Sequence, residues 1–195
     1  MTRSRARGIG SCLAAIGLAL ALAGCALPSP VPTLVPIFTQ LPVLRYHNET
    51  ALDLLYPAHW VYAVVTKGLL VFGESDTIAG GKPGASLTVY RQSALAAPDT
   101  LQAALQDYLD RGPASTGYKT IGEARASQLG GREALEVFVE SGAEASGDAP
   151  AMKGYIVLAR ASSGAVYVLT ATAPKSAWDQ AWPLFAIIIQ SVQFN

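Results

Sequence analysis

The sequence predicts an α+β domain in which a mainly antiparallel sheet lies between helices, an α/β/α arrangement. Four apolar segments follow one another between residues 118 and 173, and the turns that join most of them suit only antiparallel neighbours. Segments 155–159 and 166–171 are apolar on both faces, which is typical of central strands that are covered on both sides. Segments 99–111 and 176–190 have apolar residues at helical spacing and would provide that cover.

Residues 1–24 have the layout of a secretory signal. Arg3, Arg5 and Arg7 form a positive start, an apolar run follows over 13–23, and small residues lead to Cys25. The run is too short for a spanning helix, which needs roughly 20 apolar residues. The tetrapeptide Leu-Ala-Gly-Cys at 22–25 resembles the lipobox of bacterial lipoproteins. A plain signal peptide without lipid is the alternative.

Cys25 is the residue that favours the lipoprotein interpretation. Residues 26–195 contain no other cysteine, and Cys12 lies in the segment that would be removed. A single thiol cannot form an internal disulfide, so an odd cysteine in an exported chain needs another explanation. The resemblance implies that the peptide is cleaved before Cys25, so that Cys25 becomes the new N-terminus. It also implies that Cys25 is acylated and that palmitate is one of the acyl groups. It also implies a lipid-anchored location on the extracytoplasmic face of the cell membrane.

Residues 25–42 are predicted to form a tether between this anchor and a globular domain over 43–195. Five prolines fall within residues 26–42, which favours extended polyproline II over regular structure. Simple disorder is the alternative. Leu34, Val35, Ile37 and Phe38 are more apolar than a spacer needs, so they either dock on the domain or lie at the membrane surface.

The charge balance argues against nucleic acid as a partner. Without residues 1–24 the 14 Lys and Arg residues fall to 11 while the 14 acidic residues remain, which gives a net charge of −3. No basic run is present, as binding to nucleic acid or to anionic lipid headgroups would require.

The first half of the domain is predicted to contain short strands and one helix. Tyr56-Pro57 closes the second strand, a hairpin turn follows at residues 66–68, and a polar loop covers 74–84. Asp99 is the expected N-cap of the helix, with Gly112 just past its end. The predicted strands are 44–47, 51–56, 60–64, 69–73 and 87–91.

The second half is predicted to form a four-stranded antiparallel meander and a final helix. Gly130-Gly131 and residues 162–164 mark tight turns, and a loose loop spans 141–151. Ser176 is the expected N-cap of the final helix, and Pro183 should kink that helix or divide it. Residues 191–194 then return to an extended form. The predicted strands are 118–127, 132–140, 153–160 and 165–173.

The order of these elements resembles the PsbP-like and Mog1-like domains. The resemblance rests on Tyr56-Pro57 followed by Trp60, on the turn at 129–134, and on the ending Ile-Gln-Ser-Val at 189–192. It implies an α/β/α sandwich of a kind used in assembly factors, binding modules and lipoproteins. Val192 stands where that group more often has an aromatic residue. No motif of a characterised binding site is matched, so the resemblance assigns no functional residue.

The sequence shows no catalytic or metal-binding signature. His47 and His59 fall on different predicted elements, where His47 suits a strand end and His59 suits a turn. Asp107 and Asp110 are three residues apart on one helix and could meet, although a solvated face is the simpler interpretation. We therefore expect no catalytic residue, no metal and no cofactor.

Two hypotheses for the function follow. The first is a non-catalytic lipoprotein that binds or helps to assemble an extracytoplasmic partner. The second is a small-ligand carrier or enzyme with a pocket between sheet and helix. A filled core with an exposed apolar patch would favour the first hypothesis, and a deep polar cavity the second. The residues predicted to line the pocket or partner surface are Tyr56, Trp60, Tyr62 and Tyr90.

Overall fold

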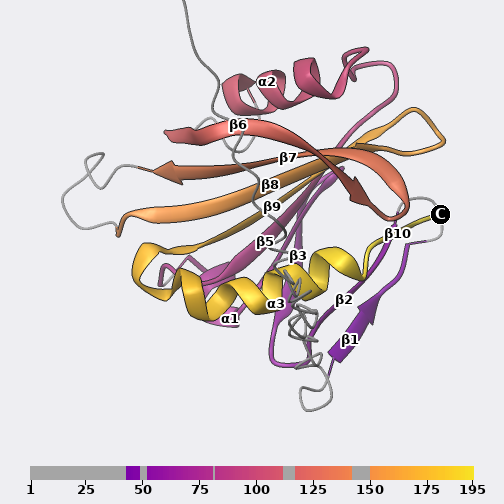
Figure 1. The fold of residues 1–195 in the computed structure, drawn as a ribbon. Helices are drawn as coiled ribbons and strands as arrows, with labels where there is room; N and C mark the ends of the chain where they lie inside the picture. The colour runs from indigo at the N-terminus through magenta and orange to yellow at the C-terminus, as the bar shows by residue number, and fades with distance from the viewer. Residues whose placement is uncertain (1–42, 49–51, 81, 112–116, 142–149) are drawn as a thin grey trace, which may run out of the picture. The chain divides into compact units, whose positions relative to one another are not determined.

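A computed structural model describes residues 43–48, 52–80, 82–111, 117–141 and 150–195. A seven-stranded antiparallel sheet forms the centre of this domain, in the order β3-β4-β5-β9-β8-β7-β6 (Figure 1). β6 to β9 are consecutive in the chain and adjacent in the sheet, which confirms the predicted meander. The strands are β3 Val61–Thr66, β4 Leu69–Gly73, β5 Ser86–Gln92, β6 Tyr118–Leu129, β7 Arg132–Ser141, β8 Met152–Arg160 and β9 Val166–Pro174.

A second, three-stranded sheet joins the two ends of the domain. β2 (Leu52–Pro57) pairs on one side with β1 (Val43–Tyr46) and on the other with β10 (Gln193–Phe194). The Leu55 N–H also donates to Ser191 Oγ at 2.8 Å. The start and the end of the described chain are therefore held by the same strand.

The C-terminal helix and β2 together cover one face of the large sheet. α3 (Trp178–Gln190) follows a 3₁₀ turn, η2 (Lys175–Ala177). Trp178, Phe185 and Ile188 are buried in a core that also contains residues of β2, β5, β8 and β9. This is the larger of the two hydrophobic layers, and its helix is the one predicted at 176–190.

The opposite face is covered by α2 (Leu101–Arg111), as predicted, so α2 and α3 lie on either side of the sheet (Figure 1). Ala104, Leu105 and Tyr108 are buried against apolar residues of β7, β8 and β9. Side chains of β7 alternate between the two faces, because Val137 and Val139 face α2 while Phe138 packs in the core with α3. Central strands β8 and β9 are apolar on both faces because each face has a cover.

Each predicted strand is present, with ends that differ by no more than two residues. The glycine turn between β6 and β7 has φ values of 55° at Gly130 and 73° at Gly131, the left-handed region that such a turn needs. His59 lies exposed in a turn, as predicted. None of the described helices is long and apolar enough to cross a membrane.

Four local predictions need correction. Thr100 caps α2 in place of Asp99, because its Oγ1 accepts the Ala103 N–H at 3.1 Å. Ser176 is not an N-cap, since it lies inside η2. Pro183 lies at an exposed position inside α3 and does not divide it, so of the two effects predicted for this proline the division is wrong. The predicted loop over 74–84 contains a short helix, α1 (Ser75–Ile78).

Several predictions concern residues outside the described ones. The signal, Cys25 and the tether fall within residues 1–42, and Gly112 and most of the 141–151 loop are also outside. These remain predictions.

Candidate functional site

Four aromatic rings gather where the small sheet meets the edge of the large one. Tyr62 of β3 makes edge-on contacts with Tyr46 of β1 at 5.3 Å and with Tyr56 of β2 at 6.3 Å between ring centroids. Phe72 of β4 lies beneath them, 5.5 Å from Tyr46 and 5.7 Å from Tyr62. Phe72 is fully buried, whereas Tyr62 is 47% exposed, so the cluster runs from the core to the surface. We call Tyr46, Tyr56, Tyr62 and Phe72 the aromatic cluster.

The structure separates the four residues predicted to line one pocket or partner surface. Tyr56 and Tyr62 do come together in the aromatic cluster. Trp60 is buried 6.1 Å from Phe185 of α3 and belongs to the core. Tyr90 lies on the opposite face of the sheet, with its ring 5.7 Å from that of Tyr108 of α2.

Strand β3, beside this cluster, is an apolar strand at the edge of the large sheet. Its sequence is VYAVVT, with no charged residue, and five of its six residues are exposed. Val64 is 65% exposed and Val65 is 55% exposed, and the β3–β4 register shifts between Val64 and Thr66. One side of β3 pairs with β4, and no described strand pairs with the other. Among the described residues, the backbone groups on that side of β3 have no partner strand, as at the edge of any sheet.

A cleft of about 380 Å³ opens between the small sheet and the end of β3. Its walls are mostly apolar, and Lys67 and Arg91 stand among them. The guanidinium of Arg91 lies 6.0 Å from the centre of the Tyr167 ring, which holds its charge at the cleft. The remaining lining residues are Tyr46, Asn48, Leu52, Val64, Gly68, Leu70, Val89 and Tyr167.

Asp53 of β2 organises a polar network on the outer side of the small sheet. It forms an ion pair with Arg45, its Oδ1 lies 2.6 Å from Nδ1 of His47, and Asn195 Nδ2 donates to the same oxygen at 3.1 Å. Hydrogen bonding from Arg45, Asn195 and His47 outweighs the burial of the side chain, so the pKa of Asp53 lies well below its usual range. The network connects β1, β2 and the C-terminus, which is a structural role.

The described residues form no catalytic centre around the histidines. His47 bonds to Asp53, but no hydroxyl of the described chain forms a hydrogen bond with its ring. Within the same residues, no three His, Cys, Asp or Glu side chains gather closely enough to hold a metal ion. Asp107 and Asp110 accept hydrogen bonds from different side chains, Asp107 from Gln92 and Arg111 and Asp110 from Gln106.

Sequence reasoning missed several residues that shape these surfaces. Tyr46 and Phe72 lie on two strands, and only the register between strands brings them toward Tyr62. The same holds for Arg91 of β5, which reaches the cleft beside Tyr46. Alternation along each strand tells which residues share a face, but it does not tell which strands are neighbours. The sequence of β3 did not indicate that this strand is exposed, because an edge strand and a central strand can have the same apolar sequence.

Comparison with known proteins supports the fold and no closer relationship. No family model matches the chain, and no curated protein matches it in sequence. A solution structure of cyanobacterial PsbP (CyanoP) from Synechocystis is similar, with a TM-score of 0.55 and 16% identity over 78% of this chain and 92% of that one. The Ran-binding protein Mog1p of Saccharomyces cerevisiae gives a TM-score of 0.54 and 12% identity over 78% of this chain and 95% of that one. The chain therefore has a PsbP/Mog1-like fold.

Proposed function

We propose that this protein is a membrane-anchored extracytoplasmic lipoprotein that acts as a non-catalytic binding or assembly module. In this proposal a partner protein binds by adding an extended segment to the free edge of β3. The observation that supports it is the exposed, uncharged, apolar edge of β3 beside the aromatic cluster. Edge strands of this kind are the usual sites of strand addition.

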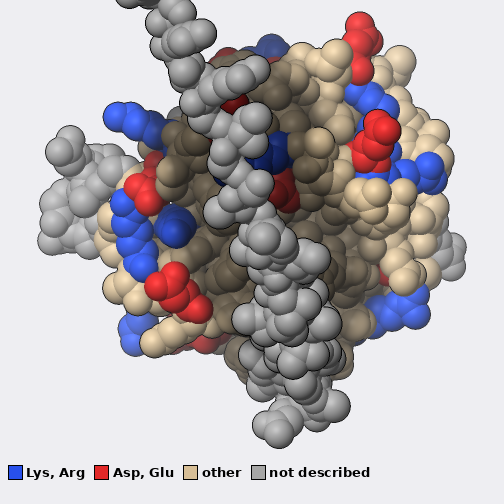
Figure 2. Space-filling view, in the orientation of Figure 1, with Lys and Arg blue, Asp and Glu red and all other residues tan. Residues whose placement is uncertain are grey.

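The other edge of the same sheet offers an internal comparison. β6 carries Lys119, Glu123 and Arg125, and its pairing with β7 is irregular between Ile121 and Arg125. Charges and bulges are the features by which edge strands avoid unwanted pairing. Opposite charges are also interspersed on the face of the domain that Figure 2 shows. β3 also has a register shift near its end, but it carries no charge, so the two edges differ in charge.

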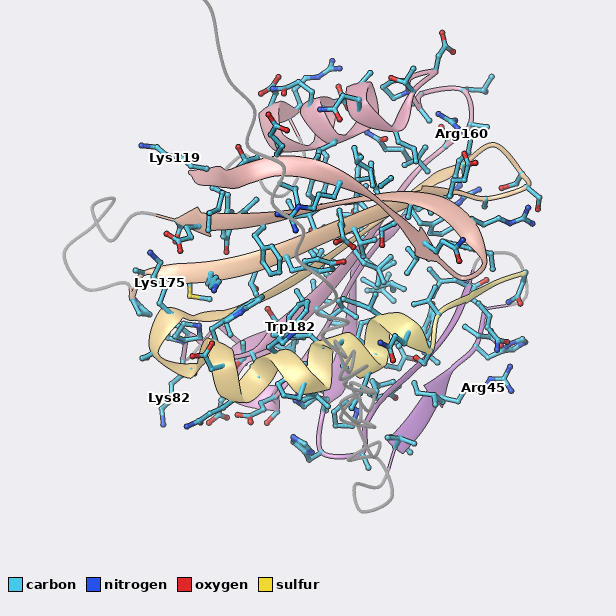
Figure 3. All side chains as sticks on the ribbon, in the orientation of Figure 1. Arg45, Lys82, Lys119, Arg160, Lys175 and Trp182 are labelled. Atoms are coloured by element: carbon cyan, nitrogen blue, oxygen red, sulfur yellow. The ribbon has the colours of Figure 1, made fainter. Side chains whose placement is uncertain are left out.

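The space between the sheet and α3 favours a binding module over a carrier or enzyme with a pocket there. Phe185 and Leu169 are fully buried, and Trp178 packs beside them in the same core. Trp182 of α3 lies against the sheet, with its ring centroid 5.0 Å from that of Tyr155 (Figure 3). A filled core with an exposed apolar strand is the combination expected for the first of the two hypotheses.

The strand-addition proposal is tested by charge substitutions on the two edges. Val64→Lys places a charge on the free edge at a largely exposed position, so the fold should survive. Ile121→Lys is the matched control, because Ile121 is an exposed apolar residue on the other edge strand. In native gels of detergent-solubilised membranes, we expect the unchanged protein and Ile121→Lys to migrate as a complex that is larger than the chain alone. Val64→Lys should lack this complex. Loss of the complex in both variants, or in neither, would contradict the role of β3.

The anchoring proposal is tested separately at Cys25. Cys25→Ala should leave the chain unprocessed or release it from the membrane, because each buried acyl CH₂ contributes about 0.8 kcal/mol to membrane binding. The measurement is the mass of the chain and its share in the membrane fraction. If both stay the same in the variant, Cys25 is not lipidated.

A further inference from the structure

The cleft between the small sheet and β3 is continuous with the free edge of β3. Val64 belongs to both, because it is an exposed residue of this edge strand and also lines the cleft. Tyr62, two residues earlier, faces the small sheet through its contact with Tyr46, and the pairing with β4 is regular from Tyr62 to Val64. A segment that pairs with β3 therefore turns every second side chain to the side on which the cleft lies.

The cleft combines an apolar floor with two cations. Leu52 and Val89 are almost fully buried in its floor. Lys67, in the β3–β4 turn, and Arg91, near the end of β5, line it and are exposed. Neither cation forms an ion pair with a described residue, and no described lining residue is a carboxylate. The described part of the cleft is therefore positively charged.

Arg91 is held on the cleft side of the sheet. It pairs in register with Tyr167 of β9, which belongs to the core on the α3 side, and its guanidinium lies 6.0 Å from the centre of that ring. The Arg91 N–H donates to the Gly68 carbonyl oxygen at 2.7 Å, so the turn that carries Lys67 lies beside it. Two neighbouring cations at the end of the free edge favour a carboxylate, which a guanidinium binds through two parallel hydrogen bonds.

We infer that the segment added to β3 carries an aspartate or glutamate whose carboxylate binds Lys67 and Arg91. An apolar residue two positions away in the same segment packs on Val64 and Leu70. The inference rests on the proposed strand addition, and residues two positions apart in a strand share a face, so both side chains enter the cleft. At roughly 30 Å³ for each water-sized group, the cleft volume of about 380 Å³ has room for about 12 groups, more than one acidic side chain fills.

The test is fluorescence anisotropy with labelled short peptides and the full chain purified in detergent. The peptides alternate threonine and valine and differ at one position, two residues after a leucine, which holds glutamate, glutamine or lysine. Their alternation lets the register shift by two residues without loss, so the variable position can reach the cleft. We expect the glutamate peptide to bind at least about fivefold more tightly than the glutamine peptide, and the lysine peptide to bind most weakly. Equal affinities of the three peptides would overturn the inference.

Charge substitutions locate the site. Arg91→Gln should reduce the advantage of the glutamate peptide to less than about twofold, whereas Arg91→Lys keeps the charge and most of the advantage. Lys67→Gln gives a second measurement if thermal unfolding shows that Arg91→Gln fails to fold. Lys119→Gln and Arg125→Gln are matched controls, because both residues are exposed cations of β6, the other edge strand. An equal loss in the controls would contradict the location.

A carboxylate of the chain itself is the alternative occupant of the cleft. Glu49 lies outside the described residues and follows Asn48, which lines the cleft. If the glutamate peptide has an advantage only in the Glu49→Gln variant, the two cations bind Glu49 and the inference is wrong.

Val65→Lys separates this inference from the proposed function. Val65 is 55% exposed on β3 and is not among the residues that line the cleft, so this variant should weaken the glutamate and glutamine peptides alike. If these two peptides bind the unchanged protein equally and Val65→Lys weakens both, strand addition stands and the acidic segment is wrong. If no peptide binds, or if binding is unchanged in Val65→Lys, both proposals are contradicted.

Discussion

Replacing Trp178 by alanine tests the packing of α3 on the sheet. Trp178 is 4% exposed, and its ring lies 5.5 Å from Trp182, 5.8 Å from Phe185 and 6.3 Å from Phe138. A buried tryptophan removes about 200 Å² from water, which at about 25 cal/mol per Å² is an upper bound of about 5 kcal/mol. Direct measurements of such substitutions give about 3–5 kcal/mol. We therefore expect Trp178→Ala to lower the free energy of unfolding by about 4 kcal/mol.

The assay is urea unfolding followed by far-ultraviolet circular dichroism, which does not depend on the fluorescence of the removed ring. The midpoint should fall while the slope of free energy against urea stays the same, since the surface exposed on unfolding changes little. Because a domain of this size has a stability of about 5–15 kcal/mol, the variant should be close to unfolding.

Trp182→Ala provides the matched control. Trp182 lies one turn further along α3 and is only partly buried, so its removal should cost about half as much. A loss below about 1 kcal/mol for Trp178→Ala, or a larger loss for Trp182→Ala, would refute the packing described above.

Three further predictions concern the turns and polar contacts. Gly130→Ala should destabilise the domain by about 2 kcal/mol, because φ is positive there and a Cβ would come within 2.8 Å of the Phe194 ring; an unchanged melting temperature would contradict this. Asp53 has a lowered pKa in the folded state, so its contribution to stability is present above about pH 4 and lost as the pH falls further. Asp53→Asn should therefore reduce the loss of stability between pH 5 and pH 3, and equal losses in both proteins would be inconsistent with the network. Thr100→Ala should cost about 1 kcal/mol by removing the N-cap of α2, as measured by urea unfolding, whereas Asp99→Ala should cost little.

Much of the architecture could be predicted because local patterns determine it. Because β8 and β9 are apolar on both faces, each face of the sheet had to be covered by another element. The helical spacing of apolar residues at 101–109 and 178–189 identified the two helices that cover it. Gly130-Gly131 fixed the β6–β7 turn through its positive φ values. These signals depend on residues that are close in the sequence.

The parts that could not be predicted depend on contacts between distant segments. Asp53 and Gln193 pair across the small sheet although 140 positions separate them, and no local pattern shows that pairing. The separation of Tyr90 from Tyr62 has the same cause. Tyr90 lies on β5 and faces α2, whereas Tyr62 lies on β3 and faces the small sheet, and only the sheet register shows this difference.

Photo-crosslinking in intact cells tests the role of β3 most directly. A photoreactive amino acid in place of Val64 or Val65 samples two exposed positions of the free edge strand, and the same residue in place of Ile121 samples the other edge strand. We predict a discrete adduct of one mass from positions 64 and 65 and none from position 121. Adducts of the same mass and yield from all three positions, or from position 121 alone, would contradict the assignment of β3 as the partner-binding edge.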